Sequence, residues 1–427
     1  MLEGPSYLIL RDLPSSCEEE SKWVYNTRLV MELSNNKRQL DDGKEVAVRK
    51  SFKLSDDTQV EEPSDDDQAA DQSDLSSLII QLGRDISINC LLRCSRSDYG
   101  SIASLNQSFR SLIRSGELYR LRQKMGIVEH WVYFSCNLLE WEAFDPNCSR
   151  WMHLPKMPSN ECFMCSDKES LAVGTELLVF GKEIMSHVIY RYNILTHTWA
   201  SGTEMNIPRC LFASSGVGNI AIVAGGCDQR GTILSSAELY NSETGTWVTI
   251  PNMNKARKMC SGVFMDGKFY VIGGIGVGNN KMLTCGEEFD LETGKWREIP
   301  NMFPGRSGGA GMTPAPAIAE APPLVAVVNN VLYAADYAQQ EVRRYDKVRN
   351  SWVIIGRLPE RVESMNGWGI AFRACGNWLI VIGGLRQMVG GTIELNSWIP
   401  DEDAPQWNLL ASKRSGSFVH NCAVMGC

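Results

Sequence analysis

The chain has 427 residues, 44% of them hydrophobic, and no run approaches the roughly 18 apolar residues of a membrane helix, so we expect two or three domains and no membrane partner. Its 14 cysteines are scattered and no signal peptide precedes them, which favours reduced thiols and predicts no bound metal or cofactor. Residues 1–75 hold 9 Lys/Arg and 18 Asp/Glu, whereas the other 352 residues hold 33 Lys/Arg and 32 Asp/Glu. The net charge of −8 therefore belongs to an acidic N-terminal tail, which argues against nucleic-acid binding.

The first 74 residues divide into two segments of different composition. Residues 1–35 form an N-terminal apolar motif segment, with two apolar clusters, at residues 7–10 and 23–31. It is either a strand or short helix docked on the folded body, or a linear motif for a partner. Residues 36–74 are charged and poor in aromatic side chains, so we expect a disordered acidic linker that buries too little apolar area to order.

Two basic clusters lie within this linker. Lys37-Arg38 is separated by a ten-residue spacer from Arg49-Lys50, with Lys53 close behind. The spacing matches a bipartite nuclear import signal, and the alternative is an ordinary charged linker. Location in the nucleus, the cytoplasm or both is therefore expected.

Residues 75–124 change character and predict a small all-α bundle. Apolar positions recur at helical spacing through Ile86, Leu91 and Leu92, and again from Tyr99 to Ile113. Gly116 separates this run from a further helix that begins at Glu117. A unit of about 50 residues is marginal alone, so one apolar face should need a partner.

From residue 128 to the end the pattern becomes a β repeat. Six tryptophans follow one another at spacings of 48 to 56 residues: Trp151, Trp199, Trp247, Trp296, Trp352 and Trp407. Glycine pairs end apolar runs at residues 225–226, 273–274 and 383–384. Between glycines and tryptophan lies a strand with an aromatic or apolar centre, at Phe144, Tyr192, Tyr240, Phe289, Tyr345 and Leu395.

Each repeat is too small to bury both faces of a four-stranded sheet, so the units should stack around an axis as a six-bladed β-propeller. The first unit lacks an innermost strand, and the segment at residues 417–426 resembles the missing strand. We therefore expect the C-terminus to complete the first blade. The first and fifth units replace the glycine pair, and a long Gly/Ala/Pro-rich insertion at residues 305–323 precedes the fifth.

These patterns resemble two known modules. The glycine pair, the Glu-x-Tyr/Phe strand and the tryptophan are similar to kelch repeats over residues 128–427. The helical segment at residues 75–124 resembles an F-box, on Leu82, Asp85-Ile86, Leu91-Leu92, Arg96, Tyr99, Phe109-Arg110, Leu112-Ile113 and residues 115–122. It departs from the usual pattern at Gly83, where a proline normally follows the leucine. The order of the modules resembles plant F-box/kelch-repeat proteins, and the opening residues resemble the Skp-interacting-partner subgroup.

The resemblance implies a substrate-recognition subunit of an SCF-type (cullin-RING) E3 ubiquitin ligase. The F-box would dock on a Skp-family adaptor, and through it on a cullin, by way of Leu82, Ile86, Leu91 and Leu92. The propeller would hold the target protein, and no covalent chemistry would be needed in this chain. The alternative is a kelch scaffold outside any ligase, whose helices are only a structural cap.

Arginines recur in the turns between blades, at Arg209, Arg257, Arg306, Arg361 and Arg414. They could line a recognition surface and bind an acidic or phosphorylated segment of the target. Alternatively they pack between blades and satisfy loop carbonyls. An enzyme is disfavoured, because the five histidines show no close metal-ligand spacing and hydrolase, Walker and zinc-protease motifs are absent.

Overall fold

The structure, a computed structural model, describes residues 78, 82–137, 139–160, 162–184, 186–278, 282–304, 320–359, 364, 366–384, 391–400, 405–416 and 418–426. The chain divides into a helical unit that ends at Met125 and a β unit that begins at Gly126. The N-terminal apolar segment, the acidic linker and its basic clusters all lie outside the described residues.

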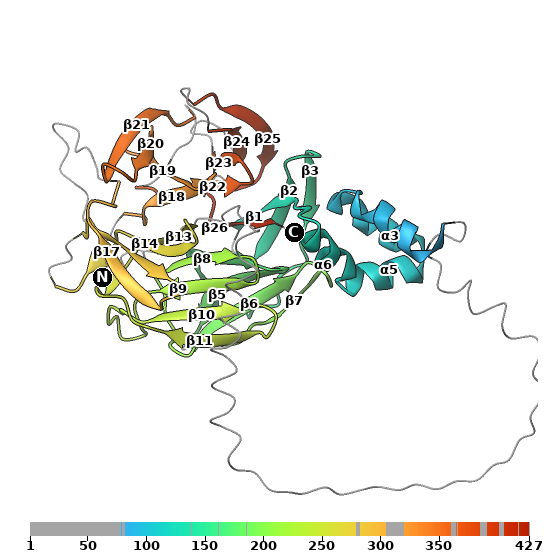
Figure 1. Ribbon diagram of the computed structural model, residues 1–427, viewed down its shortest axis with the longest axis horizontal. Helices are drawn as coiled ribbons and strands as arrows, with labels where there is room; N and C mark the ends of the chain where they lie inside the picture. Colours follow the sequence, from blue (N-terminus) through green and yellow to red (C-terminus); the bar gives the residue numbers. More distant parts are fainter. Residues whose placement is uncertain are drawn as a thin grey trace, which may run out of the picture. The chain divides into compact units, whose positions relative to one another are not determined.

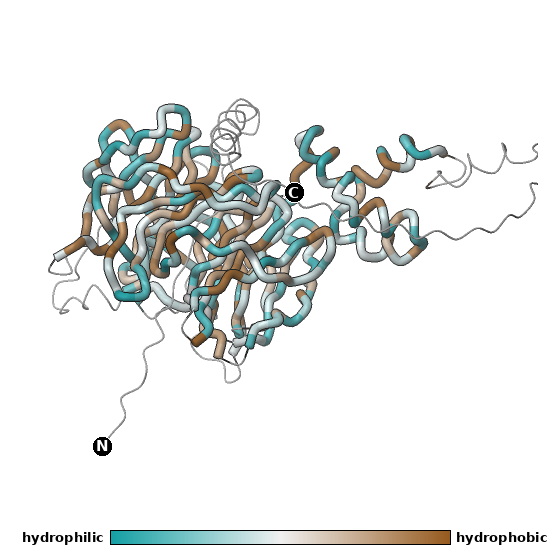
Figure 2. The backbone as a smooth tube through the Cα atoms, turned by 90° about the horizontal axis from the view of Figure 1, so that it is seen from below, coloured by the Kyte–Doolittle hydropathy of each residue, from teal (hydrophilic) through white to brown (hydrophobic). Residues whose placement is uncertain are grey.

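The helical unit consists of α3 (Gly83–Leu92), the 3-10 turn η1 (Arg96–Asp98), α4 (Tyr99–Leu105), α5 (Gln107–Arg114) and α6 (Glu117–Lys124). The start of α5 is fixed by Asn106, whose side chain accepts a hydrogen bond from the Phe109 amide at 2.8 Å. Gly116 separates α5 from α6 with φ 74°, a left-handed conformation that favours glycine. Hydrophobic and hydrophilic segments alternate along these helices (Figure 2).

The helices pack around a core of their own. Its buried apolar side chains are Ile88, Leu91, Leu92, Tyr99, Phe109, Leu112, Ile113, Leu118 and Tyr119. Arg122 is buried among them and donates to the Cys94 carbonyl at 2.9 Å, while its guanidinium lies 5.9 Å from the Tyr99 ring centroid. In the described part of the chain, no helix has the length and apolar character to cross a membrane.

In its described residues, the β unit contains six four-stranded antiparallel sheets, the blades. From its innermost strand outwards, blade 1 is β26 (Asn421–Gly426), β1 (His130–Asn137), β2 (Glu140–Asp145) and β3 (Arg150–His153). In the same order, blade 2 is β4 (Phe163–Val173), β5 (Glu176–Glu183), β6 (Ser186–Asn193) and β7 (Thr198–Ser201). Blade 3 is β8 (Ala213–Val217), β9 (Ile220–Ala224), β10 (Ala237–Asn241) and β11 (Thr246–Ile250).

The second half of the ring repeats this order. Blade 4 is β13 (Ser261–Met265), β14 (Lys268–Ile272), β16 (Gly286–Asp290) and β17 (Lys295–Ile299), with a small extra pair of β12 (Arg257–Lys258) and β15 (Ile275–Gly276). Blade 5 is β18 (Leu324–Val328), β19 (Val331–Asp336), β20 (Glu341–Asp346) and β21 (Ser351–Arg357). Blade 6 is β22 (Ile370–Cys375), β23 (Trp378–Gly384), β24 (Thr392–Trp398) and β25 (Asn408–Arg414).

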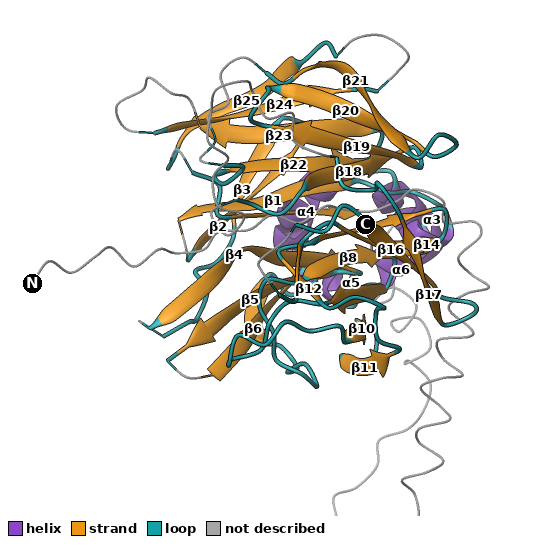
Figure 3. Cartoon of the chain, turned by 90° about the vertical axis from the view of Figure 1, so that its left-hand side faces the viewer, coloured by secondary structure: helices purple, strands orange, loops and turns teal. Residues whose placement is uncertain are grey.

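The blades form a closed ring (Figures 1 and 3). Each innermost strand contacts the next, in the cycle β26, β4, β8, β13, β18, β22 and back to β26. The C-terminal strand β26 pairs with β1 in antiparallel register, with Val132 opposite Val424. The sequence-based prediction of a six-bladed propeller completed by the C-terminal segment is therefore confirmed.

The repeated tryptophans join neighbouring blades. In blades 1 to 5 each faces the central aromatic residue of the adjacent strand, as Trp247 faces Tyr240 with ring centroids 4.9 Å apart. The indole of Trp247 also donates to the Thr203 carbonyl of the loop before the blade, at 2.9 Å. Blade 6 departs from this register, because Leu395 faces Ala411 and Trp407 packs on Trp398 instead.

The glycine pairs have a backbone role in two blades. Gly225 and Gly226 have φ 70° and 90°, and the pair in blade 4 is similarly left-handed. A Cβ on Gly226 would lie 2.4 Å from the Cys210 carbonyl oxygen, so the loop before the blade passes too close for a side chain. In blade 6, by contrast, the pair at residues 383–384 continues β23 without positive φ.

Candidate functional site

Helix α3 presents two apolar faces with different exposure. Leu82, at the N-cap, is 41% exposed and Ile86, one turn later, is 55% exposed. Leu91 and Leu92 are only 6% and 3% exposed. Residues four apart share a face of a helix, whereas position 91 lies about half a turn and position 92 about a quarter turn around the axis from position 82. The exposed pair is the part of α3 available to a partner.

This distribution corrects the docking surface expected from the sequence. Leu91 and Leu92 belong to the core of the helical unit, so of the four residues predicted to dock a Skp-family adaptor only Leu82 and Ile86 are exposed. The structure also accounts for Gly83 in place of a proline. Its φ of 70° is open to glycine and closed to proline, whose ring fixes φ near −65°.

In the β unit, the loops that precede the innermost strands and those that join second to third strands lie at one end of the ring, because the strands alternate in direction. We call this end the loop face. Arg209 lies in such a loop, and its guanidinium donates to the Ser236 carbonyl at 2.7 Å and to Glu238 at 2.6 Å. The side chains of both ionic partners are completely buried, and burial lowers the pKa of Arg209 although Glu238 opposes the shift.

Arg257 repeats this arrangement one blade later. It donates to the Gly273 and Cys285 carbonyls at 3.0 and 3.1 Å and to Glu287 at 2.6 Å, again with no side-chain exposure. The carboxylate of Glu287 accepts two further bonds from the amides of Asn254 and Lys255. Loop, second strand and third strand are thus joined by one buried ion pair, which we call the Arg–Glu clip.

The clips correct the expected ring of recognition arginines. Arg209 and Arg257 instead pack within the blades and bind loop carbonyls, because a guanidinium without exposed surface cannot contact a partner. Arg414 is exposed at the end of β25, and Arg306 and Arg361 lie outside the described residues. The signal that sequence reasoning missed is the matched spacing from arginine to glutamate on the third strand in both blades.

An apolar cluster lies on the loop face among segments from several blades. It consists of buried Met259, Ile275, Ala321 and Trp368, with partly buried Leu211, Met282 and Phe418 against them. The same face carries exposed apolar side chains at Met164 in β4, Ile184 after β5 and Val277 after β15, which are 52%, 70% and 74% exposed.

Two buried cations connect innermost strands beneath this face. Lys168 of β4 donates to the carbonyls of Gly367 and Ile370 at 2.7 and 2.9 Å. Arg373 of β22 donates to the Cys422 carbonyl of β26 at 2.9 Å. Burial lowers the pKa of Lys168, with a further contribution from Arg373, and burial lowers the pKa of Arg373 to about 10. Their hydrogen bonds hold blades 1, 2 and 6 together.

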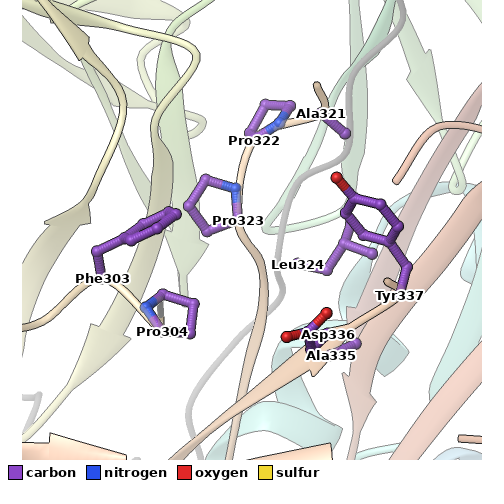
Figure 4. Close-up of a pocket in the computed structure, with 9 residues that line it drawn as sticks. All are labelled: Phe303, Pro304, Ala321, Pro322, Pro323, Leu324, Ala335, Asp336 and Tyr337. Carbon is purple, nitrogen blue, oxygen red and sulfur yellow. The ribbon is translucent and has the colours of Figure 1, made fainter. Parts of the chain in front are cut away.

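A small pocket opens between blades 4 and 5, where Phe303 and Pro304 face Pro323 and Tyr337 (Figure 4). The space open to the centre of a water molecule inside it is about 30 Å³, which holds a few water molecules rather than a metabolite. Among the described residues, no three His, Cys, Asp or Glu side chains gather as a metal site would require.

Comparison with known proteins agrees with this architecture. The family model for the Kelch motif matches residues 208–254 and 256–303. The chain is 61% identical to the Arabidopsis thaliana F-box/kelch-repeat protein At1g74510 over all of both chains. It is 68% identical to F-box/kelch-repeat protein SKIP11 of the same plant, over 84% of this chain and 78% of the relative, and 58% identical to F-box/kelch-repeat protein At1g26930 over 96% and 95%. The chain belongs to the F-box/kelch-repeat proteins.

Proposed function

We propose that the chain is the substrate-recognition subunit of an SCF-type E3 ubiquitin ligase. In this proposal the helical unit docks a Skp-family adaptor, which links the chain to a cullin, and the propeller holds the target protein. The chain contributes no chemistry of its own and acts by raising the effective concentration of target lysines near a charged E2. The basic clusters at Lys37-Arg38 and Arg49-Lys50 motivate a site of action in the nucleus, the cytoplasm or both.

The observation that carries the adaptor half is the exposed apolar face of α3. A unit with four short described helices buries a small core. Leaving Leu82 and Ile86 about half exposed sacrifices roughly half of the about 1.5–3 kcal/mol that full burial of each side chain provides. A partner that covers both recovers this energy. The membership in F-box/kelch-repeat proteins makes a Skp-family adaptor the partner of first choice.

The target half rests on the loop face. With Arg209 and Arg257 buried in clips, an acidic or phosphorylated segment has few arginines to meet among the described loops. The exposed apolar side chains Met164, Ile184 and Val277 instead favour a target segment with apolar anchors.

Co-purification of the full chain with a Skp-family adaptor tests the first half. Ile86→Asp and Leu82→Asp should abolish adaptor capture and leave the circular dichroism spectrum unchanged, because both side chains are exposed. Leu105→Asp on α4, whose side chain is 70% exposed, is the matched control and should retain capture. If wild-type chain captures no adaptor, the ligase proposal is abandoned in favour of a kelch scaffold outside any ligase.

Proximity labelling in plant cells tests the target half. Val277→Asp on the loop face should remove specific neighbours that the wild-type chain labels. The control is Val348→Asp, since Val348 is 96% exposed in the turn between the third and fourth strands of blade 5, at the opposite end of the ring. Equal loss with both variants would show that the loop face has no special part in target binding.

A further inference from the structure

Two cysteines face each other across adjacent loops of blade 3. Cys210 follows the clip arginine of the incoming loop, and Cys227 follows the glycine pair after β9. Their backbones exchange both hydrogen bonds of an antiparallel pair, at 3.0 and 2.7 Å. Their sulfur atoms lie 3.6 Å apart. Two thiols are thus held in contact by main-chain bonds that do not depend on the side chains.

The neighbouring blade shows that the fold does not require cysteine at these positions. In blade 4 the same bridge joins β12 and β15, and Lys258 pairs with Ile275 one residue after the clip arginine and after the glycine pair. A lysine and an isoleucine satisfy the same backbone geometry. The cysteine pair is therefore a feature of blade 3 that the repeat does not explain.

The geometry fits a disulfide. Opposed residues in a hydrogen-bonded antiparallel pair have Cα atoms about 5.5 Å apart, inside the range of about 4.4–6.8 Å that disulfides span. From a separation of 3.6 Å the sulfur atoms must approach by about 1.6 Å to reach bonding distance, which side-chain rotation and a small loop adjustment supply. Access is unequal, because Cys210 is partly exposed and Cys227 is buried.

We propose that Cys210 and Cys227 form a reversible redox pair that a peroxide oxidises to a disulfide on the loop face. The Cys210 thiolate attacks one oxygen of hydrogen peroxide, the O–O bond breaks, and Cys210 becomes a sulfenic acid while the other oxygen leaves as water after protonation. The Cys227 sulfur then attacks the Cys210 sulfur, the S–O bond breaks, and the oxygen leaves as a second water. Two thiols are oxidised and one peroxide is reduced.

The disulfide would couple two loops of the loop face. Its formation would tie the loop that leads into β8 to the loop between β9 and β10, with about 16 residues between its ends. Leu211, the residue after Cys210, packs against the apolar cluster of the loop face and accepts a bond from the Met259 amide at 2.8 Å. Oxidation therefore acts on the loop face, which also carries the exposed side chains Met164, Ile184 and Val277, and this inference goes beyond the proposed ligase function.

Peptide mapping of the full chain by mass spectrometry tests the proposal. After treatment with hydrogen peroxide, a linked Cys210–Cys227 peptide should appear, lighter than its two separate thiol peptides by the mass of two hydrogen atoms. In Cys227→Ser the first step proceeds without the second, so Cys210 should be trapped as sulfenic acid and react with dimedone. Oxidation of the exposed Cys148 and Cys162 with Cys210 and Cys227 left as thiols would overturn the proposal.

Reversibility is tested on the same oxidised chain. Reduced glutathione should restore both thiols, because Cys210 is partly exposed and exposed disulfides are the more readily reduced ones. The matched control is Lys258→Cys/Ile275→Cys in a Cys210→Ser/Cys227→Ser background, which places a cysteine pair at the same bridge of blade 4. A linked peptide that glutathione cannot open would identify a permanent structural disulfide and refute the reversible pair.

Discussion

Replacing Arg257 by methionine is a direct test of the Arg–Glu clip. The substitution keeps an unbranched apolar stem but removes the donors to the Gly273 and Cys285 carbonyls and the positive partner of Glu287. Both ionic side chains are fully buried, so Glu287 would keep its charge without its counter-ion. Breaking a buried pair from one side costs about 3–5 kcal/mol, which lowers the folding equilibrium constant by about 10² to 10⁴.

Urea unfolding of the full chain, followed by tryptophan fluorescence, measures this loss as a lower midpoint. Lys255→Met is the matched control, because Lys255 pairs with Glu298 in the same blade at 2.5 Å while both side chains stay about 40% exposed. Exposed pairs contribute about 0–1 kcal/mol, so the control should barely move the midpoint. If Arg257→Met unfolds with the wild-type midpoint but no longer captures a target, the arginine serves recognition and the clip reasoning is wrong.

Three further substitutions separate other contributions to the ring. Gly225 has φ 70°, and a Cβ on it would lie only 2.4 Å from a carbonyl oxygen, so Gly225→Ala should lower the free energy of unfolding in urea by about 2–4 kcal/mol. Gly231→Ala is the control and should lower it by only about 1 kcal/mol, because Gly231 has φ 81° but open space around it. Trp407→Phe removes the indole bond to the Arg357 carbonyl at 2.8 Å and should lower the free energy of unfolding by about 1 kcal/mol. For Glu288, burial acts to raise the pKa, but hydrogen bonds from an arginine and a lysine outweigh it and hold the pKa below its usual value. The stability that this carboxylate contributes is present above its unfolded pKa and is lost as pH falls through its folded pKa. As pH is lowered from 7, the melting temperature of Glu288→Gln should therefore fall less steeply than that of the wild-type chain.

The repeat architecture could be predicted from the sequence because its signals are local and periodic. Each tryptophan faces an aromatic residue seven positions earlier in blades 1 to 5, so a single blade already contains the pattern. Closure of the ring could also be predicted, since β26 carries the alternation of an innermost strand that blade 1 lacks. Blade 6 could not be aligned correctly in this way, because a bulge between Leu395 and Asn396 shifts the outer strand.

Exposure was harder to predict, because it depends on which distant segment covers a side chain. The two faces of α3 could have been separated by the helical period, which puts Leu82 and Ile86 together and Leu91 and Leu92 elsewhere. In each clip the arginine and its glutamate lie about 30 residues apart in the sequence. Considered singly, each would be predicted to be an exposed charged side chain. Only the pair, repeated at nearly the same spacing of 29 and 30 residues, indicates burial.

Blade 5 shows which property of the clip the fold requires. At the strand position that Glu238 and Glu287 occupy, two residues before the central aromatic side chain, it carries Arg343. This arginine pairs with Asp336 at 2.8 Å and Glu341 at 3.0 Å, and it donates to the Pro304 carbonyl at 2.7 Å. The charges are rearranged, yet a buried ion pair still holds the incoming loop to the strand. The Kelch family model matches the two stretches that contain an Arg–Glu clip, so it depends on the residue identities of blades 3 and 4. The fold itself requires only that the loop carbonyls and the buried charges of each blade have hydrogen-bond or ionic partners.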